Sequence, residues 1–378
     1  MIVHSSFQYR LLAQHYSKPE DNLLLTIAIP HYKQRRYLEV VLNSLFSQTY
    51  DNFEILVSDD CSPDDSNEVI PGTLQASGRP FRYYTHPENL GYDGNVRFCL
   101  SAAYGRYVFL LGNDDALGDT QTLANVASLL ETLQYPEVAF TNFGDYSTGL
   151  VVRRAQRTQV LGSGPETAVR FFRSFSFVSG LIFERDVAQA HETTRWDQSV
   201  FYQIYLASRI IASGGRLAGL ETCAVRKDVT VNGQRVPSMY TNRWREGADK
   251  FNPAQALASV VRVTADGILP VVAPDAQSKT LRQILIQILG VSYAYWLLEY
   301  RRVATWRYSA WIAQGMWPGR LLAEYPYLTS CDRLLIWPFY TAVTLTGLLI
   351  PQKLFQLSKE RLADGVRSLQ QRKCNRTE

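Results

Sequence analysis

The sequence contains little cysteine and no paired pattern of it. Only five cysteines occur in 378 residues, at Cys61, Cys99, Cys223, Cys331 and Cys374, and no two share the C-x-x-C spacing of a structural zinc site. The odd number and the irregular spacing argue against a disulfide framework and indicate a reducing compartment. Residues 1–22 also lack an apolar stretch of signal-peptide length, so we expect the first domain to stay in the cytoplasm.

Neither sign of charge dominates the whole chain, whose net charge is +4, but the charges are unevenly distributed. Residues 281–378 contain 13 Lys and Arg against 6 Asp and Glu, whereas residues 1–280 contain 26 against 29. The same basic segment holds five of the seven tryptophans, Trp296, Trp306, Trp311, Trp317 and Trp337. A basic segment rich in Trp is typical of contact with an anionic membrane surface. We expect no nucleic-acid partner, because these basic residues are interleaved with a long apolar run.

Apolar runs alternate with amphipathic stretches over most of residues 1–225. Residues 23–30, LLLTIAIP, have the composition of a strand buried on both faces. Residues 37–50, YLEVVLNSLFSQTY, have helical apolar spacing, and residues 53–60, FEILVSDD, return to a short buried strand. The pattern predicts an α/β fold built on an open, mostly parallel sheet with helices on both faces.

Two acidic pairs follow predicted buried strands directly. Asp59 and Asp60 end one strand, and Asp114 and Asp115 follow the apolar run VFLLG at residues 108–112. Such residues commonly cap helices, which is the alternative interpretation. Ligands, however, collect at the carboxyl ends of parallel strands, and two unit charges about 4 Å apart repel by about 1 kcal/mol even in water. We therefore expect a divalent cation with oxygen ligands there.

Four short segments in order resemble one known family. They are IPHYKQ at 29–34, VSDDCSPDD at 57–65, ENLGYDGN at 88–95 and LLGNDD at 110–115. Through these segments, residues 1–225 resemble a family 2 glycosyltransferase with the GT-A fold. The sequence of the last two segments is most similar to the abequosyltransferase-like branch of bacterial surface-polysaccharide enzymes. The resemblance implies transfer of a sugar from a nucleotide-diphosphate donor to a saccharide acceptor carried on a polyprenyl diphosphate lipid. A Mg²⁺ or Mn²⁺ cofactor would act as a Lewis acid on the departing diphosphate.

The resemblance also implies roles for individual residues. Asp115 matches the metal-binding carboxylate of the DxD-type motif, and Asp114 faces the ribose or sugar of the donor. Asp60 matches the carboxylate that meets the donor base, on which Tyr32 would pack. Asn113 departs from the acidic residue often found at its place, but its carbonyl can still accept a bond. The predicted donor-binding residues are Pro30, Tyr32, Asp59, Asp60, Asn89, Gly91, Asn95, Arg97, Asn113 and Asp114.

The general base is the site residue for which the sequence gives the weakest indication. Inverting members of the family usually carry a Glu-Asp pair where this chain has Tyr202 and Gln203, and neither can serve as a carboxylate base. Asp197 is the nearest alternative, and the other interpretation is that it caps the helix that follows. Glu184 and Asp186 are weaker candidates, so the stereochemical outcome stays open.

An uncharged run, residues 334–352, lies between Arg333 and Lys353. A helix of about 18 residues would reach about 27 Å, slightly less than the hydrocarbon core of about 30 Å. Pro338 and three Thr favour a helix or hairpin in the membrane interface over a full span, and packing against the catalytic domain is the alternative. Residues 353–373 have the pattern of a basic amphipathic helix at the same surface.

These features divide the chain into four parts. They also predict a location on the cytoplasmic face of the membrane, with attachment through the last part. Whether that part also crosses the bilayer once stays open. The parts are an N-terminal extension at 1–22, a catalytic domain at 23–225, a linker on the acceptor side at 226–280, and a helical membrane-associated region at 281–378.

Two other functions fit parts of the pattern. A sugar-nucleotide pyrophosphorylase also binds nucleotide and metal on an α/β sheet, but those enzymes share a Gly-rich loop after the first strand, where this chain has IPHYKQRR. A degenerate glycosyltransferase acting as a membrane scaffold would explain Asn113 and the missing Glu-Asp pair.

Overall fold

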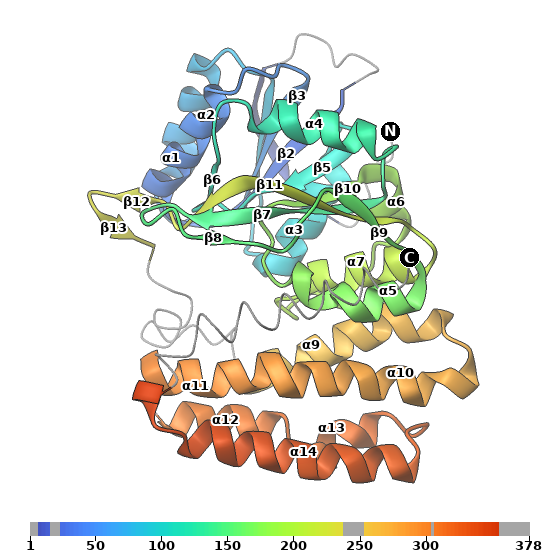
Figure 1. Ribbon diagram of the computed structural model, residues 1–378. Coiled ribbons are helices and arrows are strands. Elements are labelled where there is room, and N and C mark those ends of the chain that lie inside the picture. The colour runs from blue at the N-terminus through green and yellow to red at the C-terminus, as the bar shows by residue number, and fades with distance from the viewer. Residues whose placement is uncertain (1–6, 16–22, 237–252, 304–305, 355–378) are drawn as a thin grey trace.

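The computed structural model describes residues 7–15, 23–236, 253–303 and 306–354, and shows a twisted sheet with helices above and below it and further helical layers beneath (Figure 1). The strands are β1 (Arg10–His15), β2 (Leu25–His31), β3 (Phe53–Asp59), β4 (Phe81–Thr85), β5 (Tyr107–Leu110), β6 (Ala116–Leu117), β7 (Val138–Asp145), β8 (Val151–Val152), β9 (Gln159–Gly162), β10 (Leu181–Glu184), β11 (Leu217–Lys227), β12 (Thr230–Val231) and β13 (Gln234–Arg235).

The helices fall into two sets. Those of the sheet domain are α1 (Arg35–Phe46), α2 (Ser66–Ala76), α3 (Gly91–Ala102), α4 (Thr122–Thr132), α5 (Gly164–Phe171), η1 (Phe172–Phe175), α6 (Arg185–Ala190) and α7 (Tyr202–Ala212). Those of the C-terminal part are α9 (Pro253–Ile268), η2 (Leu269–Val271), α10 (Pro274–Gln287), η3 (Ile288–Tyr293), α11 (Ala294–Val303), α12 (Trp306–Gly315), α13 (Pro318–Leu321), η4 (Leu322–Glu324) and α14 (Ser330–Leu349).

The main sheet has the order β1-β4-β3-β2-β5-β10-β7-β11-β6, with β8 and β9 at its side. Strands β4, β3, β2 and β5 run parallel, as do β7 and β11, while β10 runs antiparallel between β5 and β7. The sequence prediction of a mostly parallel α/β sheet is therefore confirmed. It missed β1, which lies within the expected N-terminal extension and pairs antiparallel with β4.

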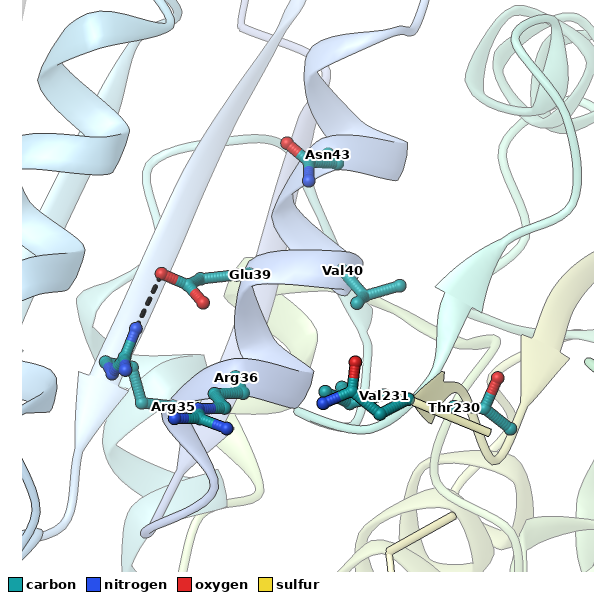
Figure 2. A pocket seen from close by; sticks show the side chains of 8 residues that line it. Arg35, Arg36, Glu39, Val40, Asn43, Thr230 and Val231 are labelled. Carbon is teal, nitrogen blue, oxygen red and sulfur yellow. Dashed lines mark hydrogen bonds and ion pairs between the residues drawn. The ribbon is translucent and has the colours of Figure 1, made fainter. Parts of the chain in front are cut away.

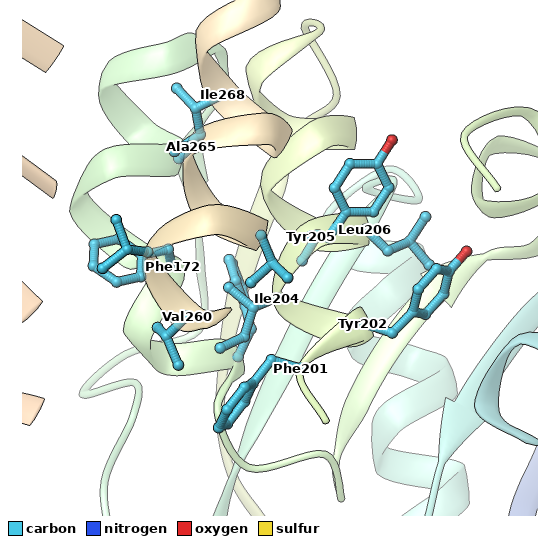
Figure 3. Packing of buried hydrophobic residues seen from close by; sticks show 14 of the residues in the cluster. Phe172, Phe201, Tyr202, Ile204, Tyr205, Leu206, Val260, Ala265 and Ile268 are labelled. Carbon is cyan, nitrogen blue, oxygen red and sulfur yellow. The ribbon is translucent and has the colours of Figure 1, made fainter. Parts of the chain in front are cut away.

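Each face of the sheet carries its own apolar core, because neighbouring residues in a strand point to opposite faces. In β2, Leu25, Ile27 and Ile29 join the core under α1, α2 and α4, whereas Ala28 joins the core on the other face. The second core continues through α3, α5 and α7 into the C-terminal helices, and Ile204 of α7 lies beside Val260 of α9 (Figure 3). The C-terminal helices are thus packed onto the sheet domain through α9.

The helical stretch Pro274–Arg302 is long and apolar enough by composition to cross a membrane, but 44% of its most apolar window is buried in the protein. The uncharged run singled out in the sequence lies mostly in α14, which contains Pro338 and packs against α10 and α11. The predicted amphipathic helix at 353–373 lies almost entirely outside the described residues.

Candidate functional site

The Asp114–Asp115 pair lies at the carboxyl edge of the sheet, between β5 and β6. Asp115 is only 4% exposed, and its Oδ2 accepts a hydrogen bond from Ser179 Oγ at 2.5 Å. Its Oδ1 accepts one from the backbone N–H of Asp228 at 2.9 Å, and the Asp114 carbonyl accepts one from Val229 N–H at 2.8 Å. The chain continues into a strand here and α4 begins only at Thr122, so the pair caps no helix.

Both carboxyl groups bind protons unusually tightly in the absence of a cation. Burial, and then the neighbouring Asp114, raise the pKa of Asp115 to about 8. Burial, and then Asp228, raise the pKa of Asp114 to about 6. Negative charge at this place is therefore costly unless positive charge accompanies it.

The oxygens of this pair converge above Gly112. A Cβ added at Gly112 would lie 3.0 Å from Asp115 Oδ2, 3.1 Å from Asp114 Oδ1 and 3.2 Å from Ser179 Oγ. Oxygen ligands of this kind suit Mg²⁺ or Mn²⁺. No group of three or more His, Cys, Asp and Glu side chains in the described ranges could hold a metal, so ligand or water oxygens would have to complete the coordination shell. The residues fit a cation that is shared with a bound phosphate.

A partly buried guanidinium holds the loop that carries Ser179. Arg154 packs between the rings of Phe140, Phe143 and Phe177. Burial lowers its pKa to about 9, opposed by the charge of Asp115. Its side chain donates to four backbone carbonyl groups, those of Thr141, Ser174, Phe177 and Ser179. Arg154 thereby fixes the loop from which Ser179 reaches Asp115.

His31 and Asn113 form one hydrogen-bonded unit beside the acidic pair. Burial lowers the pKa of His31 to about 4, so its ring is neutral near pH 7. Its Nδ1 lies 3.0 Å from Asn113 Nδ2 and must accept, since an amide nitrogen only donates. Its Nε2 therefore carries the proton and donates to Ser66 Oγ at 2.9 Å. Asn113 Nδ2 also contacts the Lys33 carbonyl at 3.3 Å, which leaves Oδ1 as the Asn113 atom available to a ligand.

Asp60 joins the end of β3 to the start of α3. Its two carboxylate oxygens accept from the N–H groups of Leu90 at 2.6 Å and Gly91 at 3.0 Å, and Asn89 Nδ2 donates to its carbonyl at 3.0 Å. Gly91 has φ +77° and a Cβ there would meet no atom, so glycine is needed for this backbone conformation and not for space. Asp59 is fully buried and accepts from Ser62 N–H and Tyr83 Oη.

Two predicted residues present groups that a ligand could use. Asn95 donates to the carbonyls of His31 and Ser58, and its buried Oδ1 has no hydrogen-bond partner in the described part of the chain. Tyr32 is 41% exposed and directly follows His31, the last residue of β2, with the Lys33 amine over its ring. An exposed aromatic ring at this edge suits stacking on a nucleotide base.

Arg97 and Asp197 lie together. Arg97 Nε and Nη2 donate to the two oxygens of Asp197 at 3.1 and 2.8 Å, and Nη1 donates to Glu192 at 2.7 Å. Asp197 does not cap α7, because Asp93 accepts from the N–H groups of Val200 and Tyr202 instead. The buried Tyr202 Oη and Gln203 Oε1 have no hydrogen-bond partner within the described ranges.

Glu184 lies at the opposite edge of the sheet. It pairs in register with Tyr107 at the amino end of β5 and contacts Arg106 at 3.4 Å, while Asp186 lies two residues further on in α6. Neither residue is near the Asp114–Asp115 pair, so the two weaker candidates for the general base are wrong.

A family match agrees with this geometry. Residues 26–181 match the family model described as glycosyl transferase family 2. Over this segment the chain is similar to family 2 glycosyltransferases. The chain is similar to abequosyltransferase RfbV of Salmonella typhimurium, with 37% identity over 97 residues, which are 25% of this chain and 29% of RfbV.

Other relatives match over similarly short segments. A Campylobacter jejuni GalNAc(5)-diNAcBac-PP-undecaprenol beta-1,3-glucosyltransferase is 32% identical over 107 residues, 28% of this chain and 34% of its own. The chain thus spans about a third of the length of these curated relatives. The crystal structure of S. aureus TarS 1-349 with UDP-GlcNAc superposes with a TM-score of 0.58 over 86% of this chain and 89% of that chain, at 16% identity, which confirms the GT-A fold class.

The carboxyl edge of the sheet gathers most of the predicted residues, but several of their partners were missed. Ser179, Asp228 and Arg154 lie far along the chain from Asp115, and no motif marks them. A surface pocket of about 480 Å³ adjoins this edge between α1 and β12 (Figure 2). Its walls are formed by Arg35, Arg36, Glu39, Val40, Asn43, Thr230, Val231 and Asn232.

Proposed function

We propose that the protein transfers a sugar from a nucleotide-diphosphate donor to a saccharide acceptor during bacterial surface-polysaccharide assembly. The observation that carries this proposal is the convergence of Asp114, Asp115 and Ser179 oxygens above Gly112 in a chain that is similar to family 2 glycosyltransferases. The names of RfbV and of the Campylobacter glucosyltransferase support transfer chemistry, and the TarS complex with UDP-GlcNAc supports a nucleotide-sugar donor.

Asp115 and Asp114 would hold a Mg²⁺ or Mn²⁺ ion, which when bound supplies positive charge to the departing diphosphate. Ser179 and the Asp228 N–H keep Asp115 in one orientation. His31 orients the Asn113 amide so that Oδ1 is available to the donor. These contacts let the carboxylates meet a cation without rearrangement.

The remaining donor-binding roles are assigned by position. Tyr32 would stack on the base, and the buried Asn95 Oδ1 would accept a donor hydroxyl. Asp60 would meet the base while holding the first turn of α3 through Leu90 and Gly91. Pro30, Asp59 and Asn89 shape this wall.

Asp197 is the proposed general base. Its side chain is 29% exposed, but Arg97 donates to both of its oxygens, so taking a proton requires this pair to loosen. Arg97 would act by positioning Asp197. A non-catalytic scaffold is the second candidate, favoured by the absence of a carboxylate at Tyr202 and Gln203.

The proposed acceptor is a saccharide on a polyprenyl diphosphate lipid, at the cytoplasmic face of the membrane. The Campylobacter relative is named for a saccharide linked to undecaprenol through PP, which supports this class. The basic, Trp-rich segment 281–378 supports attachment to the membrane surface.

The test is a thermal-shift panel of UDP-, CDP-, GDP- and dTDP-sugars with and without Mn²⁺. A ligand at about 100 times its Kd adds about 2.7 kcal/mol of stability. We expect one nucleotide class to stabilise wild type only with Mn²⁺, Asp115→Ala to lose the shift, and the exposed control Asp186→Ala to keep it. Absence of a shift with every donor would contradict the proposal and favour the scaffold.

A further inference from the structure

Helix α14 has one face buried in the protein and one face in contact with solvent. Asp332, Ile336, Tyr340 and Gly347 lie on the buried face. Tyr340 Oη donates to the Ala313 carbonyl at 2.7 Å, and a Cβ at Gly347 would come within 2.7 Å of Leu297. The helix is therefore held against α11 and α12 along its length.

The opposite face of α14 lacks charge and is mostly apolar, with Thr341 and Thr346 as its exposed polar residues. Leu334 and Leu349 are each 71% exposed, and Leu335 and Leu345 are more than half exposed. The spacing from Leu334 through Pro338 and Leu345 to Leu349 follows one side of a helix over about 22 Å. Exposed leucines at both ends of one helix face, with Pro338 and Ala342 exposed between them, are unusual on a surface that meets only water and mark a site of contact.

Exposed tryptophans lie in or beside α12 and α13, the two short helices that contact α14. Trp306 and Trp311 of α12 and Trp317 beside α13 are each more than 40% exposed. Figure 1 shows α12, α13 and α14 as the layer farthest from the sheet, with α10 and α11 between. Amphipathic Trp rings concentrate at membrane–water interfaces. The apolar face thus occupies the outermost surface of the helical part of the molecule.

The charges around this layer select the kind of surface it fits. Arg307 and Arg320 are exposed, with no ion pair in the described part of the chain, and Lys353 follows the C-terminal end of α14. Residues 281–354 carry 7 basic against 3 acidic residues. Each Lys or Arg near an anionic bilayer adds attraction.

We propose that the outer face of α14, with these tryptophans, docks into the headgroup region of an anionic phospholipid bilayer and lies parallel to its plane. The contacts of the buried face to α10, α11 and α12 keep α14 along the bundle, which favours an in-plane helix over a span. The inference rests on the proposed function in one respect: it names the surface through which the proposed membrane localisation would be achieved.

The experiment measures binding of the full-length protein to vesicles of phosphatidylglycerol and phosphatidylethanolamine, with phosphatidylcholine vesicles as the comparison. We expect wild type to bind phosphatidylcholine vesicles at least about tenfold more weakly than anionic vesicles. We expect the double variant Leu345→Glu/Leu349→Glu to bind anionic vesicles at least about tenfold more weakly than wild type. The control Leu150→Glu, 59% exposed near β8, should bind as wild type. A thermal melt of each variant verifies folding.

Several results would overturn the proposal. They are no vesicle binding by wild type, unchanged binding by the double variant, or conversion of a wild-type dimer to a monomer by the double variant, which would assign the face to a second copy. Loss of binding only on deletion of residues 355–378 would assign the contact to that segment. Vesicle binding needs no donor, so failure of the Mn²⁺-dependent donor shift would refute the proposed function alone.

Discussion

Replacing Asp115 by Asn should stabilise the cation-free protein while abolishing its response to Mn²⁺. Asp115 is buried, and burial together with Asp114 raises its pKa to about 8. The ionised carboxylate is therefore an unfavourable group in the folded state at alkaline pH. The introduced asparagine would have nearly the same shape and no charge, so it would remove that cost.

The size of the effect follows from the shift. A pKa of about 8 against an ordinary value of 3.8 corresponds, at about 1.4 kcal/mol per unit, to a ceiling of about 6 kcal/mol at pH 8. The introduced asparagine can still accept from the Asp228 N–H, but its amide nitrogen would face Ser179 Oγ, which would have to turn its hydrogen away. We expect the free energy of unfolding of Asp115→Asn to exceed that of wild type by about 2 kcal/mol at pH 8.

The pH dependence has a definite sign. Because the folded pKa lies above the unfolded one, the stability from the protonated carboxyl is fully present below about pH 4 and is lost as the pH rises to about 8. The advantage of Asp115→Asn should grow across this window and stay level above it.

Chemical denaturation at pH 5, 7 and 8.5, with EDTA and then with Mn²⁺ and a nucleoside diphosphate, measures both halves of the prediction. The exposed Asp186→Asn serves as the matched control. Asp115→Asn that is less stable than wild type at pH 8.5, or equally stable at every pH, would refute the electrostatic argument. A Mn²⁺ response that survives in the variant would refute the assignment of Asp115 as a cation ligand.

Three further substitutions test other parts of the site. Asp197→Asn should lower kcat at least about 100-fold with donor binding unchanged; a loss below about tenfold with a lower Tm would mean that Asp197 only anchors Arg97. Arg154→Lys keeps the charge, but a lysine cannot reach all four carbonyls, so both Tm and the Mn²⁺-dependent thermal shift should fall. A thermal shift equal to that of wild type would contradict the positioning of Ser179 by Arg154. Tyr32→Leu should weaken donor binding about tenfold at constant Tm by removing stacking of about 1–3 kcal/mol, measured by calorimetry; unchanged affinity would remove Tyr32 from the base site.

The parallel part of the sheet could be predicted because its strands are local. The runs that form β2, β3 and β5 are short and apolar, and polar residues bound each of them. Their local composition is therefore enough to identify them as strands. β1 and β10 could not be predicted, since one joins the sheet edge from before the first apolar run and the other enters antiparallel between β5 and β7. Their places depend on pairing between distant segments, which single-sequence periodicity does not record.

The same limit applies to the site. The acidic pair could be predicted from the sequence, but the contacts that hold it could not. Ser179 lies 64 residues beyond Asp115 and Asp228 lies 113 residues beyond it, in loops without distinctive composition. Asp197 and Arg97 were each identified from the sequence, but their mutual contact across 100 residues changes what either can do.

The departure at Asn113 has a physical explanation in its neighbour His31. A neutral His31 presents the Nδ1 lone pair to residue 113, so a donor is required there, and the Asn113 amide supplies it at 3.0 Å. An aspartate at 113 would bring a second acceptor against that lone pair. The ring proton would then have to move to Nδ1, which would remove the Nε2 donation to Ser66, or the imidazole would have to be charged in a place where burial lowers its pKa to about 4. A histidine at 31 therefore makes asparagine the compatible residue at 113, and Asn113 need not indicate lost catalysis.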